Sequence, residues 1–315
     1  MHTITHNKPP RIGLALGSGG ARGWAHVGVL RYLQEMHVPV ACVAGTSIGA
    51  LMGAAFAARR LDVLEDLSHE LDWKRVARLF IEVGIPRAGL VTCKHIQQFF
   101  HDIVHVARIE DLEIPFAAVA ADLQSQEQVV LTHGGVVDAI RASIAIPGIF
   151  VPARHEGHDL IDGGAVNPLP VDVARELGAD VVIAVDVNQR PGRGLPPRAH
   201  APDAPVRPQA HDVPEILARI GAHLPPLQGA VAEVYQRWLR REPHGLTIFE
   251  VLTRSVRIAE TQLTHSRLLL HPPDVLIRPA VGDLDTLEFH HSADAIEAGH
   301  AAAAECAAEI KRFLT

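Results

Sequence analysis

The sequence predicts an α/β fold, in which helices cover both faces of a mostly parallel central sheet to form a three-layer α/β/α sandwich. Apolar runs of strand length alternate with helical segments along the chain, as they do in doubly wound proteins. Runs such as VVIAVDV at 181–187 are almost continuously apolar, which is typical of parallel strands buried on both faces. Aromatic residues make up only 4% of the chain, so Ala, Val, Leu and Ile dominate the apolar positions.

Strands and helices follow one another directly in the first part of the chain. RIGLAL is an apolar run that ends in glycines, which indicates a first buried strand. The next segment repeats apolar residues at helical spacing until Pro39 stops it. VACVAG is a second buried run, and a small, Ala-rich helical segment follows it. We therefore expect a strand at 11–16, a helix at 22–37, a strand at 40–45 and a helix at 47–60.

The same alternation continues to the end of the chain. We expect further helices at 62–80, 94–106, 136–146, 170–177, 246–270 and 292–313. We expect further strands at 115–123, 128–132, 159–164, 181–187 and 274–279. This order places most strands parallel to one another, with a helix in each crossover.

The chain reads as a polar tail at 1–10 and a single domain at 11–315. The tail lacks the basic and then apolar pattern of a signal peptide, and no stretch reaches the roughly 18 apolar residues of a membrane span. Pro, Arg and His dominate from 189 to about 226, which predicts a long exposed excursion within the domain.

Composition excludes several classes of protein. The net charge of -7 provides no basic field for nucleic acid, so we expect no nucleic-acid partner. Cys42, Cys93 and Cys306 form no CxxC pair, which argues against a zinc site or a disulfide framework. We therefore expect a cytoplasmic protein that needs no metal or cofactor. The sequence does not determine its oligomeric state.

A G-x-S-x-G motif, Gly45-Thr46-Ser47-Ile48-Gly49, lies between the second strand and the Ala-rich helix. A nucleophilic serine needs a sharp strand-to-helix turn that pushes its hydroxyl out of the sheet, and small residues on either side allow that turn. The helix N-terminus favours the negative charge that develops during attack. Alone, the motif is also compatible with a serine that simply caps a helix.

A glycine-rich loop follows the first strand and opens the first helix. Backbone N–H groups in such a loop can cradle a phosphate or form an oxyanion hole. The spacing fails the dinucleotide pattern G-x-G-x-x-G, and the second strand lacks an acidic residue for a ribose. No Lys-Ser/Thr pair follows, so a Walker A loop is excluded. The loop consists of Gly17, Ser18, Gly19, Gly20, Ala21, Arg22 and Gly23.

A carboxylate followed by two glycines, Asp162-Gly163-Gly164, ends another short strand. The pattern fits an acid at a crowded site where the backbone must approach closely, but an ordinary Asp-Gly turn is the better explanation of the motif in isolation. An anion-binding loop, an elbow serine and a later acid, all at strand ends, together make the parts of an acyl-transfer site.

Four segments carry a family resemblance in a set order: GLALGSGGARGWAHVGVLRYL, AGTSIGALMGA, IRASIAIPGIF and LIDGGAVNPLPV. They resemble the bacterial patatin-like phospholipases, relatives of plant patatin and of the neuropathy target esterase catalytic domain, over about residues 11–188. The resemblance implies a patatin-like fold and hydrolysis of lipid esters by a Ser–Asp dyad, without a catalytic histidine.

Carried over by position, the resemblance makes Ser47 the nucleophile and Asp162 the base. It also implies that the loop amides of Gly19, Gly20 and Ala21 bind the oxyanion, with Arg22 as the basic loop residue of the family. Many members have glycine where this chain has Ser18, a change that leaves the amide in place. The substrate class is a lipid ester, and the sequence does not separate phospholipase, lysophospholipase and general esterase.

Alternative mechanisms remain open from the spacing. A Ser–Asp–His triad would use His290 or His291, which follow the expected strand at 274–279. Asp186 is a weaker alternative base, because it also ends an apolar strand. His26, in the first helix, has an ordinary packing role as its simplest interpretation.

Two further alternatives concern what the protein binds. A non-catalytic protein that binds an anion or a nucleotide through the glycine-rich loop would retain no activity toward esters. Arg254, Arg257 and Arg267 lie among apolar residues in the expected helix at 246–270. This helix offers a face for peripheral contact with the inner face of a membrane, and an ordinary solvated face is the competing interpretation.

Overall fold

The structure is a computed structural model that describes residues 9–70, 94–188, 248–286 and 288–314. The chain divides into two compact units, Met1–Leu195 with Leu252–Thr315, and Pro196–Val251. The first unit contains the sheet and the site described below. The expected excursion at 189–226 and Cys93 lie outside the described residues.

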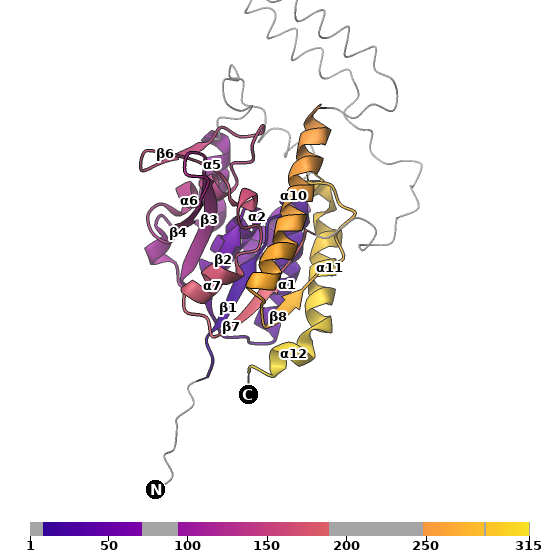
Figure 1. Ribbon diagram of the computed structural model, residues 1–315. Coiled ribbons are helices and arrows are strands. Elements are labelled where there is room, and N and C mark those ends of the chain that lie inside the picture. Colours follow the sequence, from indigo (N-terminus) through magenta and orange to yellow (C-terminus); the bar gives the residue numbers. More distant parts are fainter. Residues whose placement is uncertain (1–8, 71–93, 189–247, 287, 315) are drawn as a thin grey trace, which may run out of the picture. The chain divides into compact units, whose positions relative to one another are not determined.

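A single mixed sheet forms the centre of the first unit, with strands in the order β5-β6-β3-β2-β1-β7-β8 and β4 paired to β3 (Figure 1). The strands from β3 to β8 along this order pair in parallel, while β4, β5 and β6 form antiparallel pairs at one side. The mostly parallel sheet expected from the sequence is confirmed. The strands are β1 Ile12–Leu16, β2 Val40–Thr46, β3 Phe116–Asp122, β4 Gln128–Leu131, β5 Ala153–His155, β6 His158–Asp162, β7 Val181–Val185 and β8 Val275–Ile277.

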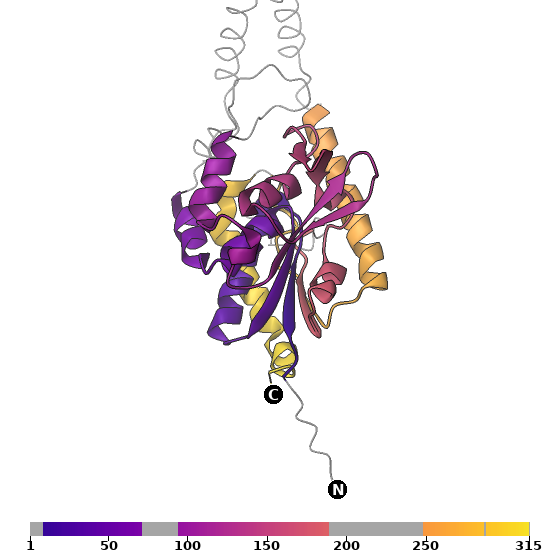
Figure 2. The same ribbon diagram turned by 90° about the vertical axis from the view of Figure 1, so that its left-hand side faces the viewer.

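Helices cover both faces of this sheet, as the three-layer prediction requires (Figure 2). The face with α7 and α10 is opposite the face with α1, α2, α3 and α11, and α1 packs along α11. The helices are α1 Trp24–Glu35, α2 Ile48–Ala57, α3 Leu61–Glu70, α5 Lys94–Val104, α6 Val136–Ser143, α7 Val171–Glu176, α10 Ile248–Leu270, α11 Ser292–Glu305 and α12 Ala307–Lys311.

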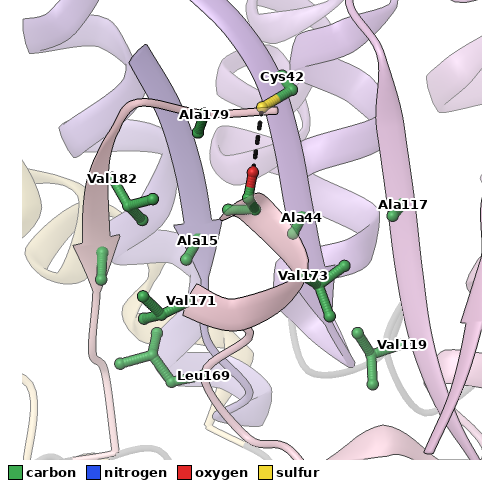
Figure 3. Packing of buried hydrophobic residues seen from close by; sticks show 12 residues of the cluster. Ala15, Cys42, Ala44, Ala117, Val119, Leu169, Val171, Val173, Ala179 and Val182 are labelled. Carbon is green, nitrogen blue, oxygen red and sulfur yellow. Dashed lines mark hydrogen bonds between the residues drawn. The ribbon is translucent and has the colours of Figure 1, made fainter. Parts of the chain in front are cut away.

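The core under α7 is built from small side chains. Ala15, Cys42, Ala44 and Ala117 from the sheet meet Val171, Val173 and Leu169 from α7 and the segment before it (Figure 3). A Cβ at Gly13 would come within 2.5 Å of the Ala179 side chain. Small residues are therefore needed here because the sheet and the α7 segment approach closely. The buried thiol of Cys42 points at the carbonyl of Ala174, 3.7 Å away (Figure 3).

Some elements differ from the expectation. β5 was not predicted, because three residues are too few to show a period. The last helix was expected to be continuous, but α11 and α12 meet at Cys306, where α11 ends and α12 begins. The helix expected at 62–80 begins as α3, and residues 71–80 of that prediction lie outside the described residues.

Candidate active site

Ser47 is the single residue between the end of β2 and the start of α2. Its backbone has φ 56° and ψ −123°, a left-handed conformation that a non-glycine residue adopts only when its surroundings impose it. A Cβ at Gly45 would lie 2.6 Å from the backbone of Ala50, and one at Gly49 would lie 2.6 Å from the carbonyl carbon of Leu16. Both motif glycines are thus required by close backbone approach, and the strand–turn–helix elbow is present.

The structure brings Ser47 and Asp162 together across 115 positions of sequence. The hydroxyl of Ser47 donates a hydrogen bond of 2.6 Å to Oδ2 of Asp162. The N–H of Gly164 donates to the other carboxylate oxygen, Oδ1, at 2.8 Å. Ser47 is 4% exposed and Asp162 5% exposed, so this pair is almost fully removed from bulk water.

The position of Asp162 follows from the antiparallel side of the sheet. Asp162 is the last residue of β6 and pairs with Ala120 of β3, while β3 lies beside β2, which ends at the elbow. Gly163 passes so close to Val119 that a Cβ would lie 2.7 Å from its carbonyl carbon. The first glycine after the acid is therefore needed for the chain to turn beside β3.

Burial, and after it the neighbouring negative charge of Glu260, raise the pKa of Asp162 to about 7. The hydrogen bonds from Ser47 and Gly164 favour the ionised form and oppose this shift in the pKa. A carboxylate of this kind is a stronger proton acceptor at neutral pH than an exposed aspartate.

Ser143, the last residue of α6, supports the elbow and was not singled out as a site residue from the sequence. Its hydroxyl accepts the backbone N–H of Ser47 at 2.8 Å and donates to the carbonyl of Val119 at 2.5 Å. It is fully buried. The only signal in the sequence was its place in the segment IRASIAIPGIF, which does not by itself indicate a contact with the elbow.

The glycine-rich loop leaves two amides facing no acceptor in the described part of the chain, those of Gly19 and Gly20. The amide of Gly17 donates to Val185 and that of Ser18 donates to Pro168. Ala21 departs from the expectation for the oxyanion hole. Its N–H donates to the carbonyl of Thr286 at 2.8 Å, so it is already occupied within the fold.

Arg22 ties this loop to the segments that follow β7 and β8. It is only 1% exposed and donates to the carbonyl of Val187 at 3.1 Å, the carbonyl of Leu284 at 3.0 Å and Oδ1 of Asn188 at 2.8 Å. Burial lowers the pKa of Arg22 to about 10, which still leaves the guanidinium charged at neutral pH. Gly23 then packs against Ile48, at the start of α2.

His26 lies beneath the same loop, fully buried, with Nε2 2.8 Å from the carbonyl oxygen of Gly17. Burial lowers its pKa to about 4, so the ring is neutral at pH 7 and Nε2 donates to that oxygen. The contact supports the packing interpretation of this histidine.

The histidines of the alternative triad have contacts of their own. His290 and His291 pack ring against ring at 4.2 Å, and His291 lies 3.4 Å from the carboxylate of Asp294. Asp186 accepts the N–H of Asn188 at 2.9 Å and faces Arg278 at 3.7 Å. In the described residues, the hydroxyl of Ser47 bonds to Asp162 and to none of these three side chains.

No group of three His, Cys, Asp or Glu side chains suited to a metal ion occurs within the described ranges. None of the helices in those ranges is long and apolar enough to cross a membrane.

An elbow serine hydrogen-bonded to a buried carboxylate, in a three-layer α/β sandwich, has the geometry of an ester hydrolase. Residues 14–175 match the family model described as patatin-like phospholipase. The chain is 34% identical over 334 residues to an uncharacterized NTE family protein from Mycobacterium bovis, covering 96% of this chain and 92% of that protein. The chain therefore belongs to the patatin-like phospholipase family, and it is a hydrolase of ester bonds.

Other similar proteins are larger. The chain is 38% identical over 184 residues to patatin-like phospholipase domain-containing protein 7 of Rattus norvegicus, covering 57% of this chain and 14% of that protein. It is 36% identical over 185 residues to neuropathy target esterase sws of Drosophila melanogaster, covering 57% of this chain and 13% of that protein. The crystal structure of VipD from Legionella pneumophila aligns with a TM-score of 0.44 at 12% identity, over 97% of this chain and 67% of that chain.

Proposed function

We propose that the protein is a lipid acyl hydrolase that cleaves carboxylic esters through a Ser47–Asp162 dyad and an acyl-enzyme intermediate. The observation that carries this proposal is the 2.6 Å hydrogen bond from the Ser47 hydroxyl to the buried Asp162 carboxylate at the elbow. No histidine separates the two groups, so the carboxylate is positioned to accept the hydroxyl proton directly.

In the first half of the reaction, the Ser47 oxygen attacks the ester carbonyl carbon while its proton passes to Asp162. The negative charge that forms on the carbonyl oxygen is stabilised by the amides of Gly19 and Gly20. The tetrahedral intermediate collapses, the bond to the alcohol breaks, and Asp162 returns its proton to the leaving alcohol. The acyl group remains on Ser47.

In the second half, Asp162 accepts a proton from a water molecule as that water attacks the acyl-enzyme. A second oxyanion forms against the same amides and collapses to release the carboxylic acid, while Ser47 regains its proton from Asp162. A raised pKa suits both halves, because the same group must accept a proton and then donate it near neutral pH.

Hydrolysis of a p-nitrophenyl acyl-ester series of increasing chain length tests this proposal. We expect wild-type activity with an optimum chain length, a fall of up to about 10⁶ in kcat for Ser47→Ala, and a large fall for Asp162→Asn. A fluorophosphonate probe should label wild type at Ser47 and leave Ser47→Ala unlabelled. Full activity in Ser47→Ala would contradict the dyad. A near-inactive His290→Ala or His291→Ala variant would instead favour the triad.

Peripheral contact with a lipid surface belongs to the same proposal, because a lipid ester is presented at an interface. Helix α10 exposes apolar side chains, including Ile258 at 65%, Leu269 at 75% and Leu270 at 74%. Co-sedimentation with phosphatidylglycerol vesicles should fall when Ile258 and Leu269 are changed to Ser, while hydrolysis of a soluble ester stays unchanged. Equal co-sedimentation of wild type and the double variant would contradict this contact.

A further inference from the structure

Helix α10 places a second carboxylate beside the serine–aspartate pair. Glu260 lies outside residues 14–175, the region that matches the family model. The carboxylate of Glu260 fills the space that a side chain at position 164 would need. A Cβ added to Gly164 would lie 3.1 Å from both the Glu260 carboxyl carbon and Oδ1 of Asp162. The second glycine of the Asp-Gly-Gly motif is thus needed because a carboxylate from another helix fills its place.

Glu260 is also joined to the glycine-rich loop through buried polar groups. The side-chain amide of Asn188 donates to Oε2 of Glu260 at 3.0 Å and to the hydroxyl of Ser18 at 2.8 Å. That hydroxyl hydrogen-bonds Glu260 in turn. The guanidinium of Arg22 donates to Oδ1 of Asn188 at 2.8 Å, so α10, the loop and the segment after β7 are connected in one network.

Charges face Glu260 from each element around it. Arg257 approaches from α10, Arg22 from the loop and Asp162 from the end of β6. Asp186 and Asp285 act on Arg22, and Asp285 and Asp283 act on Arg257. The two arginines favour the ionised form of Glu260, whereas its own burial opposes that form and raises its pKa.

We propose that Glu260 is a positioning residue of the Ser47–Asp162 site, where its carboxylate holds the glycine-rich loop through Asn188 and Ser18 and its charge favours proton transfer to Asp162. This inference rests on the proposed function. Two neighbouring carboxylates repel each other when both are ionised. When Asp162 accepts the Ser47 proton, that repulsion is relieved, so the charge of Glu260 lowers the barrier to the step.

The pH dependence of kcat/KM for a soluble p-nitrophenyl ester tests the role of the charge. Because the pair titrates as a unit, removal of one charge should move the acid limb of the profile to lower pH. For Glu260→Gln, we expect a downward shift of about one pH unit in the midpoint and a lower kcat on the plateau. Glu260→Asp keeps the charge and should keep the wild-type midpoint.

A matched control changes the same charge on another helix. Glu297 is exposed on α11, and Glu297→Gln should leave both kcat and the midpoint at wild-type values. Glu260→Ala is a second neutral variant, and it should reproduce the downward shift. A purely structural role predicts a lower Tm and a rate reduced equally at every pH. An unshifted or raised midpoint in both neutral variants would therefore overturn the inference.

The same measurements separate this inference from the proposed function. If wild type hydrolyses the ester, Ser47→Ala is inactive and the Glu260 variants keep the wild-type midpoint, only the role of Glu260 is wrong. If Ser47→Ala keeps full activity, the dyad is wrong and the role of Glu260 in it is wrong with it.

Discussion

Ser143 receives the backbone N–H of Ser47 on its hydroxyl oxygen, at 2.8 Å, and so holds the elbow from the end of α6. The same hydroxyl donates to the carbonyl of Val119, in β3. Because the Ser47 amide is engaged in this way, it does not contribute to an oxyanion hole. The left-handed conformation of Ser47 is thus stabilised by a side chain 96 positions away in sequence.

Replacement of Ser143 by Ala should weaken both the fold and the site. It leaves the amide of Ser47 and the carbonyl of Val119 buried without a partner, which costs about 1–3 kcal/mol of unfolding free energy. We expect a fall in kcat/KM of about tenfold or more, measured beside urea unfolding. Ser68→Ala, which removes a hydroxyl that donates to the carbonyl of Glu65 within α3, is the control and should retain activity. Wild-type stability and activity in Ser143→Ala would contradict the support role.

Replacement of Gly20 by Ala should reduce activity more than it reduces stability. Gly20 has φ +57°, and a Cβ would lie 2.5 Å from both the carbonyl oxygen and the Cγ2 of Thr286. The loop must shift to relieve this clash, and a misplaced oxyanion donor costs about 10²–10³ in kcat. Gly157 provides the control, because it has φ +92° with nothing within 4 Å of an added Cβ. Gly157→Ala should lose only the stability that the positive φ costs, and it should keep the wild-type kcat. An equal loss of kcat in both variants would contradict the explanation that the clash with Thr286 displaces the loop.

Asp162→Asn should lose activity but be more stable than wild type above neutral pH. The folded-state pKa of Asp162, about 7, lies above its unfolded value, so ionisation of this group favours the unfolded chain. Its contribution to stability is therefore fully present below about pH 4 and is lost as the pH rises to about 7. We expect Asp162→Asn to gain up to about 4 kcal/mol relative to wild type at pH 8, and little at pH 4. Urea unfolding at both pH values measures this gain. An equal gain at pH 8 and pH 4 would contradict the explanation that the buried charge of Asp162 destabilises the folded protein.

His26 should make the fold sensitive to mild acid. Its folded-state pKa, about 4, lies below its unfolded value, so the neutral ring stabilises the protein above about pH 6.5. That contribution is lost as the pH falls from about 6.5 to 4, by roughly 3 kcal/mol at most. We expect His26→Gln to be less stable than wild type at pH 7, because the packing and the bond to Gly17 are disturbed. Its stability should decline less between pH 7 and pH 4.5, and a decline identical to that of wild type would exclude His26 as the cause.

The strands and the elbow could be predicted because their signals are local. The apolar runs that became β1, β2, β3 and β7 agree with the expected boundaries to within one or two residues. The two glycines around Ser47 indicate a tight turn, and the turn requires them because of close backbone contacts. β5 could not be predicted, because a strand of three residues is too short to show a period.

The surroundings of the pair could not be predicted, because they depend on segments far apart in the sequence. Asn188 and Glu260 are separated by 72 positions, and neither belongs to a motif. The carbonyl of Thr286 accepts a hydrogen bond from the N–H of Ala21, which the family resemblance had assigned to the oxyanion hole. Nothing in the glycine-rich loop itself indicates which of its amides will donate a hydrogen bond to another segment of the chain.

The sequence by itself determined the alternation of strands and helices, the turn at Ser47 and the family to which the chain belongs, since each depends on residues within a few positions of one another. Only the tertiary structure decided that Asp162 meets Ser47, that Glu260 fills the space above Gly164 and that the amides of Gly19 and Gly20 meet no acceptor among the described residues. Burial and charge coupling exist only after distant segments have packed together, and these two effects raise the pKa of the candidate base.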